Sequence, residues 1–502
     1  YVLSNGAGNG HTYLPKSQLV ESACSLLGVD ASIVENAIVL LAVNRSIFVE
    51  EVEDDTAVYM ASFYFAELGV CKRLMKLSMI DMDPIFTDVE EELKKFQKEQ
   101  GMIFAAQQKK AIIESMSNGV VVITGGPGTG KTTTINCIIK LFEKQGLNVV
   151  LAAPTGRAAK RMFETTAHEA MTIHRLLEYG YAEGQDVFNK GEEDPIAADA
   201  VIVDEMSMVD ILLMNHLLKA IVPGTRLILV GDVDQLPSVG PGNVLRDIID
   251  SKLIKVVRLT DIFRQAQESM IIVNAHRINR GEFPYVNVRE KDFFFDRQEK
   301  TQDILDTLKQ LVLNRLPKFG GYHPLDDIQI LTPMRKGAIG VNNLNIEIQK
   351  VLNPPSSSKK EKEYRDIIYR QHDKVMQIKN NYKMEWKRFL GDSVIEEGEG
   401  IFNGDVGYIA DIDEEEQSVT VVFDHDKKVN YDFSQLDELE LAYAISIHKS
   451  QGSEFPVVII PLAWGPPMLM NRNLLYTAVT RAKEMVVIVG RERMIKSMVE
   501  ND

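Results

Sequence analysis

The sequence predicts a multidomain α/β protein with two α/β lobes, and three observations support this fold class. Short β-branched runs such as GVVVIT, DAVIVDE and TRLILVGD alternate with amphipathic segments over residues 96–275, as expected for buried parallel strands joined by crossover helices. A second alternating region covers residues 276–352 and 441–502, with strands such as DIQILTP and EMVVIVG. The 502-residue length also exceeds the roughly 250 residues that one hydrophobic core normally serves.

Three further segments accompany the two lobes. Residues 1–95 show helical periodicity without catalytic motifs, as in YMASFYFAELGVCKRLMKL, so we expect a small helical domain there. Residues 178–198 are polar and contain glycine, and we expect a hairpin that projects from the first sheet. Residues 353–440 begin with the loop-like NPPSSSKKEKEYR and continue with short strands such as SVTVVFD separated by turns, which predicts a small β-barrel inserted into the second lobe.

Composition sets broad limits on function. The net charge of −16 argues against a protein coated in basic surface, although a local cationic groove for nucleic acid is compatible with it. The cysteines Cys24, Cys71 and Cys137 lack C-x-x-C spacing, which disfavours a disulfide framework or a zinc cluster and indicates a reducing compartment. No apolar run approaches the roughly 18 residues of a membrane span, so we expect a cytoplasmic protein without a membrane partner. The chain begins at Tyr1 rather than Met, and we expect that an upstream region has been removed.

The clearest motif is TGGPGTGKTTT at residues 124–134, between an apolar strand and a helix. It matches the phosphate-binding loop Gly-x-x-x-x-Gly-Lys-Thr. In such a loop the glycine N–H groups and the helix N-terminus surround the phosphates, Lys131 reaches the β and γ oxygens, and the Thr132 hydroxyl ligates Mg²⁺. A glycine turn without a ligand is the alternative, and the flanking strand and helix argue against it. The expected nucleotide-binding residues are Gly126, Pro127, Gly128, Thr129, Gly130, Lys131, Thr132 and Thr133.

Polar residues after later strands extend this site. In VIVDEMSMVD, Asp204 is placed to hold Mg²⁺ and Glu205 to orient or deprotonate the attacking water. Gln235 follows another buried strand and is placed to sense the γ-phosphate. Arg264 and Arg481 lie far from the phosphate loop in sequence, and guanidinium groups brought in from a neighbouring domain stabilise transition-state charge. Taken singly, the glutamine would be a solvated loop residue and each arginine a surface ion pair.

The ordered set of motifs resembles superfamily 1 helicases, and most closely their RecD-like branch. The resemblance covers residues from about 100 to 490. It rests on GGPGTGKTTT, APTGRAAKRM, TIHRLL, VDEMSMVD, VGDVDQLPSVGPGNVL, IFRQ, LTPMRKGAIGVNNLN, AISIHKSQGSEF and LLYTAVTRAK, in family order. It implies two RecA-like P-loop domains, with a hairpin at 178–198 and an SH3-like β-barrel at 353–440. Residues 1–95 resemble, more weakly, the region before the motor in stand-alone RecD-like proteins.

The resemblance also implies roles for individual residues in nucleotide binding. Gln108 occupies the position of the family's adenine-reading glutamine, and the adjacent Gln107 leaves the register open. Phe263 stands where relatives stack a tyrosine on the base. Arg264 and Arg481 match the two arginine fingers of the family, and Gln235 matches its coupling glutamine. Gly452 and Glu454 fall in the segment that touches the γ-phosphate and ribose.

For nucleic acid, the resemblance implies contacts from both lobes. The expected DNA-binding residues are Pro154, Thr155, Arg157, Thr172, His174, Arg175, His448 and Lys449. The hairpin resembles the pin that splits a duplex, with Tyr179, Tyr181 or Phe188 as wedge or packing residues. Its many carboxylates argue against tight phosphate binding by the pin. Acidic runs in the barrel, EEGEG and DEEEQ, leave only a limited face for the single strand.

The sequence therefore predicts an ATP- and Mg²⁺-dependent DNA helicase, and the resemblance implies movement from 5′ to 3′ along single-stranded DNA. We expect a monomer that acts on single-strand/double-strand junctions in repair, recombination or replication, and that meets partner proteins through its N-terminal region. An ATP-gated nucleic-acid-binding module without unwinding activity is the alternative. A small-molecule phosphotransferase would have no use for two distant arginines and a second lobe.

Overall fold

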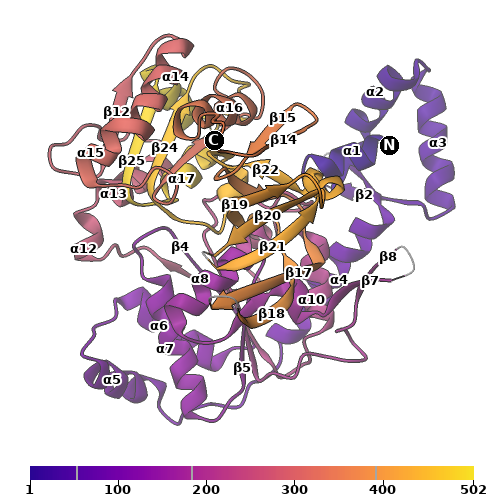
Figure 1. Cartoon of the computed structure of the whole chain (residues 1–502). Coiled ribbons are helices and arrows are strands. Elements are labelled where there is room, and N and C mark those ends of the chain that lie inside the picture. Colours follow the sequence, from indigo (N-terminus) through magenta and orange to yellow (C-terminus); the bar gives the residue numbers. More distant parts are fainter. Residues whose placement is uncertain (53–54, 183–184, 391–392, 425, 502) are drawn as a thin grey trace. The chain divides into compact units, whose positions relative to one another are not determined.

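The computed structural model describes residues 1–52, 55–182, 185–390, 393–424 and 426–501, and it divides into two compact units (Figure 1). The first unit contains residues 1–154 and 158–261, and the second contains residues 155–157 and the chain from 262 onward. The chain passes from the first unit to the second at residues 261–262, and the domain boundary at 275 stays a prediction. Helix α13 (Met270–Asn279) belongs to the second unit, where Asp292 caps it by accepting hydrogen bonds from the N–H groups of Met270 (2.7 Å) and Ile271 (3.2 Å).

A six-stranded parallel sheet forms the centre of the first unit, in the order β11-β4-β10-β9-β5-β6. Strands β9 and β10 are buried along their whole length, which explains their nearly continuous apolar sequences. The sheet strands are β4 (Val120–Gly125), β5 (Val149–Ala153), β6 (Ala170–Thr172), β9 (Ala200–Val203), β10 (Arg226–Gly231) and β11 (Lys255–Leu259).

Alternate residues of each strand face opposite sides of this sheet. Val121 and Ile123 belong to a core that includes helices α6 and α7, whereas Val120 and Val122 belong to a second core that includes α4, α10 and α11. The covering helices are α4 (Ala61–Ser78), α5 (Val89–Gln100), α6 (Ala106–Ser117), α7 (Lys131–Lys144), α10 (Ile211–Lys219) and α11 (Val244–Ser251). The first predicted α/β lobe is therefore confirmed as a sheet covered on both faces.

The N-terminal region contains the expected helices and also a small antiparallel sheet, in the order β1-β3-β2, which the sequence analysis did not predict. Its last helix, α4, packs against α10 and contributes to the core of the parallel sheet. The N-terminal region thus belongs to the first unit and is not a separate one. Its elements are α1 (Val2–Gly8), β1 (Tyr13–Pro15), α2 (Lys16–Leu27), α3 (Ala31–Val43), β2 (Ile47–Val52) and β3 (Asp55–Met60).

The predicted hairpin is confirmed as a two-stranded antiparallel ladder of β7 (Tyr179–Ala182) and β8 (Gln185–Phe188) (Figure 1). It follows the short helix α9 (Ile173–Leu176) and precedes β9. Residues 183–184 and the side chain of Tyr181 lie outside the described part of the chain. The exact bounds of the insertion, 178–198, stay a prediction.

The second unit is built on a five-stranded parallel sheet in the order β12-β25-β24-β13-β23, which confirms the second α/β lobe. Its core is continuous with that of the inserted β-domain. The sheet strands are β12 (Phe293–Arg297), β13 (Ile328–Thr332), β23 (Ala444–Ser446), β24 (Phe455–Leu462) and β25 (Ala482–Gly490). Its helices include the short α12 (Arg264–Gln267), α14 (Thr301–Gln310), η2 (Leu311–Arg315), α15 (Leu316–Gly320), α16 (Val341–Leu352), η4 (His448–Ser450), α17 (Arg472–Val479) and α18 (Glu492–Glu500).

The inserted β-domain forms a seven-stranded antiparallel sheet in the order β18-β17-β21-β20-β19-β16-β22, beside a hairpin of β14 (Glu361–Tyr364) and β15 (Ile367–Arg370). In β20 buried and half-buried residues alternate strictly, as in a sheet with one face on a core. Within the described residues, β18 and β22 are the edges of an open sheet. Its strands are β16 (Lys374–Gln377), β17 (Asn381–Leu390), β18 (Ser393–Ile401), β19 (Val406–Asp413), β20 (Ser418–Phe423), β21 (Lys427–Asp432) and β22 (Leu439–Leu441).

A helix that crosses a membrane must be long and apolar. No single helix in the described ranges is long and apolar enough, and only α2 and α3 taken together, bent by 117°, have the necessary length and composition.

Candidate nucleotide and nucleic-acid sites

Predicted site residues of the first unit follow the carboxyl ends of parallel strands, and these ends meet at one edge of the sheet. The phosphate loop follows β4, Asp204 follows β9, and the loop with Gln235 follows β10. Pro154 follows β5, and Thr172 ends β6. Four strand spacings separate β4 from β6, or roughly 20 Å. The sheet order therefore places nucleotide-binding and strand-binding residues on one edge but well apart.

The phosphate loop has the backbone that a bound phosphate requires. Gly128 and Gly130 adopt left-handed φ angles of 75° and 78°, which favour glycine. A Cβ on Gly125 would lie 2.8 Å from Thr129 Oγ1 and 2.9 Å from Leu259 O, so that position also requires glycine. The Lys131 ammonium donates to the carbonyls of Gly125 (2.5 Å) and Gly126 (3.2 Å). Lys131 thus lies folded over the cradle that surrounds phosphate in such loops.

In the acidic pair after β9, Glu205 is buried, Asp204 is half-buried, and the two are held in a defined geometry. Glu205 has a left-handed φ of 53°, and its N–H donates to Asp204 Oδ1 at 2.8 Å. Burial and the neighbouring Glu205 carboxylate raise the pKa of Asp204, and the positive charge of Lys131 opposes this rise. A half-buried carboxylate near the positive charge of Lys131 suits a divalent cation, because Mg²⁺ prefers oxygen ligands.

Arg161 is a contributor to this site that the sequence analysis missed. Its guanidinium lies 3.4 Å from Glu205 Oε1 and comes from α8 (Gly156–Thr166). The sequence feature that could have identified Arg161 is its position four residues after Arg157 in APTGRAAKRM. This spacing places both arginines on one face of a helix. The ion pair fixes the direction of the Glu205 carboxylate.

Gln235 is almost fully buried, at 7% exposure. Its Nε2 donates to Asp232 Oδ2 at 3.2 Å, and Asp232, also missed from sequence, accepts from the Asp234 N–H as well. Among the described residues, Gln235 Oε1 has no hydrogen-bond partner. A buried amide oxygen without a donor is unfavourable, and a nucleotide-site water is the kind of ligand that would satisfy it.

The structure places the two candidate adenine-reading glutamines differently. Gln108 is only 1% exposed. Its Oε1 accepts from the Ala105 N–H (3.0 Å) and its Nε2 donates to the Gly130 carbonyl (3.2 Å). The oxygen and the nitrogen of the Gln108 amide therefore both bond to backbone atoms of this chain. Gln107, by contrast, is half-buried. The expected role of Gln108 stays a prediction, and Gln107 is the more accessible of the two.

In the second unit, Arg481 lies beside the segment that contains Gly452 and Glu454. Its Nη1 donates to Ser453 O and its Nη2 to Thr480 Oγ1, each at 3.3 Å. The residue is 2% exposed, and among the described residues its Nε has no hydrogen-bond partner. A buried guanidinium whose hydrogen bonds, within the described part of the chain, are two long ones to neutral oxygens has unused capacity for an anion.

The other nucleotide-binding candidates of the second unit range from buried Gly452 to exposed Phe263. Gly452 has a left-handed φ of 72°, and Glu454 lies 3.6 Å from Lys483. Phe263 is 36% exposed, just before α12. Arg264 begins α12, and its side chain lies outside the described part of the chain.

The strand-binding candidates of the first unit surround helix α9. The Thr172 hydroxyl accepts from the Arg175 N–H at 3.1 Å and so caps this helix. Arg175 is exposed and His174 is half-buried. Pro154 is half-buried at the end of β5, whereas residues 155–157, including Thr155 and Arg157, group with the second unit.

The second unit contributes His448 and Lys449 from the turn η4, which follows the carboxyl end of β23. Burial lowers the pKa of His448, so its ring favours the neutral form. The Lys449 ammonium donates to Glu440 Oε2 at 3.0 Å, and Arg335 pairs with the same carboxylate. The carboxylate orients both cations and offsets part of their charge.

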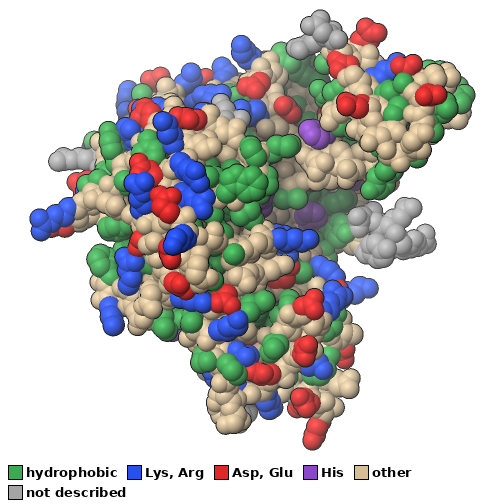
Figure 2. Space-filling view, turned by 90° about the horizontal axis from the view of Figure 1, so that it is seen from above, with side chains coloured by type: hydrophobic (Ala, Val, Ile, Leu, Met, Phe, Trp, Pro, Cys, Tyr) green, Lys and Arg blue, Asp and Glu red, His purple; other side chains and the backbone are tan. Residues whose placement is uncertain are grey.

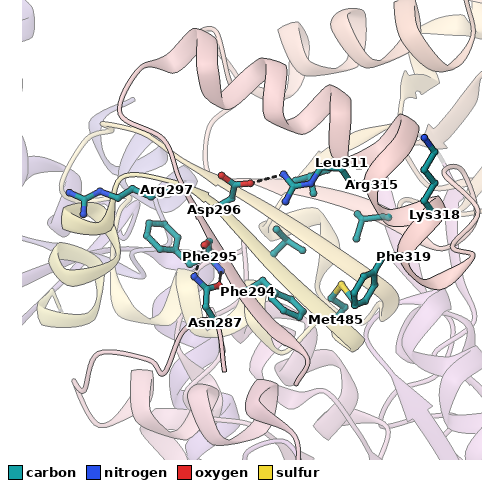
Figure 3. A pocket seen from close by; sticks show the side chains of 12 residues that line it. Asn287, Phe294, Phe295, Asp296, Arg297, Leu311, Arg315, Lys318, Phe319 and Met485 are labelled. Atoms are coloured by element: carbon teal, nitrogen blue, oxygen red, sulfur yellow. Dashed lines mark hydrogen bonds and ion pairs between the residues drawn. The ribbon is translucent and has the colours of Figure 1, made fainter. Parts of the chain in front are cut away.

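Figure 3 shows a pocket of about 590 Å³ on the edge strand β12 of the second sheet. Phe294, Phe319 and Met485 provide apolar walls, and Asp296 pairs with Arg315 at 2.7 Å on another side. None of the predicted site residues lines it. The pocket is therefore separate from the nucleotide site.

The charged surface is mixed. Figure 2 shows Lys and Arg side chains interspersed with Asp and Glu over the face it presents. In the inserted β-domain, Arg388 pairs with both Glu396 and Asp426.

Three family models match parts of the chain. The "AAA domain" model matches residues 108–241, the "ATP-dependent RecD-like DNA helicase SH3 domain" model matches residues 344–423, and the "UvrD-like helicase C-terminal domain" model matches residues 441–489. Their order agrees with the first α/β lobe, the inserted β-domain and the end of the second lobe.

Curated relatives extend this agreement along the chain. An ATP-dependent RecD2 DNA helicase of Deinococcus radiodurans is 36% identical over 386 residues, which are 77% of this chain and 49% of the relative. The RecBCD enzyme subunit RecD of Mycobacterium tuberculosis is 30% identical over 78% of this chain and 70% of its own. The chain thus spans about half of the first relative. A structure of Pif1 helicase from Bacteroides in complex with ADP-AlF3 and ssDNA aligns with 77% of this chain and 92% of its own, at 23% identity and a TM-score of 0.44.

Proposed function

The chain belongs to the RecD-like family of superfamily 1 DNA helicases, and from this premise we propose that it is an ATP-dependent DNA helicase. It moves along single-stranded DNA from 5′ to 3′ and separates the strands of a duplex. One observation supports the proposal above all others: Lys131, Asp204 and Gln235 follow three adjacent parallel strands at one sheet edge. Strand-binding candidates follow the next two strands of the same edge.

ATP is the substrate, and residues of both α/β domains contact it in this proposal. Lys131 and the loop N–H groups bind the β and γ phosphates. Thr132 and Asp204 would hold Mg²⁺, which would neutralise charge on these phosphates. Glu205, held by Arg161, orients the attacking water and accepts its proton, and Gln235 hydrogen-bonds the same water. Arg481 and Arg264 stabilise the charge that develops on the transferred group.

Movement along DNA follows from alternating grip. Thr172, His174 and Arg175 of the first domain and Lys449 of the second contact the strand backbone, where cationic and polar groups supply most of the affinity. Hydrolysis then couples to stepping because the nucleotide and strand-binding segments of the first domain share one rigid sheet edge. The hairpin of β7 and β8 acts as the pin that separates the duplex. The inserted β-domain lies along the single strand.

Strand displacement on duplexes with either a 5′ or a 3′ single-stranded tail tests this proposal. We expect ATP-dependent displacement of the 5′-tailed duplex, and none by Lys131→Ala, which loses ATP turnover but keeps its fold and part of its strand binding. Displacement of the 3′-tailed duplex alone would contradict the direction. ATP-dependent strand binding without displacement would identify an ATP-gated binding module instead.

A further inference from the structure

The base of the hairpin is enclosed by an aromatic cluster that joins it to the strand-binding segment. The rings of Tyr179 and Phe188, which pair across the hairpin, lie 5.2 Å apart. The His174 ring lies 5.5 Å from Tyr179 and 6.0 Å from Phe188. A DNA-binding candidate and both strands of the pin therefore share one set of ring contacts.

Helix α10 contributes a further ring, that of His216, to this cluster. Its ring stacks on Phe188 at 4.2 Å with an interplanar angle of 28°. Burial lowers the pKa of His216, and the positive charge of Lys219 adds to this effect. The uncharged ring favoured by this environment packs on an aromatic face as an apolar group does. His216 is outside every motif that the sequence analysis used.

Helix α4 of the N-terminal region holds α10 at very close range. A Cβ on Gly69 would lie 2.5 Å from the side-chain oxygen Oδ1 of Asn215, so Asn215 of α10 lies directly against α4. Phe63, Val70 and Leu74 of α4 are buried in the core that also contains α10. The two helices therefore form one packed body, with Asn215 facing α4 and the next residue, His216, stacked on the hairpin.

The same helix reaches the segment that leaves the hairpin. Arg73 of α4 forms an ion pair with Glu192. Between Glu192 and β8, the Lys190 N–H donates to the Leu177 carbonyl at 3.1 Å, so the chain is also tied to the segment that enters the hairpin. The base of the hairpin therefore contacts α10 through Phe188 and α4 through Glu192.

We propose that α4 and α10 form a brace that fixes the hairpin relative to the strand-binding segment, with His216 and Arg73 as positioning residues for unwinding. The N-terminal region then forms part of the unwinding machinery, in addition to any binding of partner proteins. This inference rests on the proposed pin role of the hairpin. A rigid pin converts each step along the strand into separated base pairs, whereas a pin free to tilt lets the motor step without opening the duplex.

The test compares His216→Ala with His216→Phe in the full chain. Strand displacement, single-strand-stimulated ATPase and amide hydrogen exchange in β7 and β8 are measured. We expect His216→Ala to speed exchange in the hairpin by about tenfold, the change that loss of one aromatic pair gives. It also slows displacement severalfold while ATPase stays within about twofold. His216→Phe keeps a ring on Phe188 and restores both readouts.

A charge reversal tests the second contact. Arg73→Glu and Glu192→Arg each slow displacement by about twofold, as expected for an exposed ion pair, and the double variant recovers the original rate. Lys72→Glu is the matched control because it makes the same charge change on the neighbouring, exposed residue of α4. Equal slowing by Lys72→Glu, or no recovery in the double variant, would refute the Arg73 contact.

Deletion of residues 180–194 distinguishes a failure of the brace proposal from a failure of the pin proposal. If the deletion leaves displacement unchanged while His216→Ala still speeds hairpin exchange, the pin role is wrong and the brace stands. If the deletion abolishes displacement but His216→Ala alters neither exchange nor displacement, the brace is refuted and the pin role stands.

Discussion

Replacing Arg481 with methionine should reduce activity and preserve or raise stability, because the two effects have separate origins in the structure. The side chain is 2% exposed, its two hydrogen bonds are 3.3 Å long and end on neutral oxygens, and its Nε has no partner among the described residues. Burying a charge without an ionic partner is unfavourable. Methionine fills a similar volume without that penalty, so we expect a free energy of unfolding between unchanged and about 2 kcal/mol higher.

Activity should change in the opposite sense. An arginine that stabilises phosphoryl-transfer charge is worth about 10³ to 10⁵ in rate, or about 4 to 7 kcal/mol in the barrier. Phosphate release in the presence of single-stranded DNA measures this loss. Urea-induced unfolding of the same preparation measures stability.

Arg370→Met is the matched control in the same unit. Arg370 is also buried, at 5%, but it bonds to Glu361 and to the Asn353 carbonyl. Because Glu361 is more than a third exposed, we expect Arg370→Met to lose about 1 to 3 kcal/mol of stability and to keep its ATPase per folded molecule. If Arg481→Met instead lost stability to the same extent and kept its ATPase, Arg481 would be a structural residue and the reasoning above would be wrong.

Three other predictions concern catalysis, the pin and pH. Glu205→Gln should lower kcat for ATP hydrolysis by about 10² to 10⁴ through loss of the general base, with fluorescent-nucleotide binding retained. Deletion of residues 180–194 should spare single-strand-stimulated ATPase and impair duplex unwinding, and equal unwinding rates would remove the pin role. Burial lowers the pKa of Lys374 from 10.5 to about 7. Between these two pH values the Lys374 amine binds a proton in the unfolded chain and loses it in the folded chain. The free energy of unfolding should therefore rise with pH from about 7 to 10.5, by at most about 1.4 kcal/mol per pH unit. Lys374→Met should flatten that slope in urea titrations at several pH values.

The sequence was most informative where local pattern and topology coincide. Apolar β-branched runs predicted parallel strands, and parallel strands bring their carboxyl ends to one edge. This is why Lys131, Asp204 and Gln235 could be grouped before their contacts were known. The N-terminal sheet was missed because the strongly periodic helix α4 dominates its surroundings, and the short alternating strands IFVEEV and DTAVYM are a weaker signal.

The partners of individual side chains could not be predicted from the sequence. Nothing in AAQQKKAI indicates that the Gln108 side-chain amide forms hydrogen bonds with the backbone of Ala105 and Gly130. His216 likewise reads as one polar residue of an amphipathic helix, and only the folded chain places its ring on Phe188. Such contacts join segments far apart in sequence, and their geometry depends on packing.

The central claim is that one ATP is contacted by groups from both α/β domains. A structure of the chain with a non-hydrolysable ATP analogue, Mg²⁺ and a single-stranded oligonucleotide tests it most directly. The account predicts that the Lys131 ammonium and the Arg481 guanidinium both lie within hydrogen-bond distance of oxygens on the same triphosphate. An analogue seated on the phosphate loop with Arg481 directed elsewhere would contradict it.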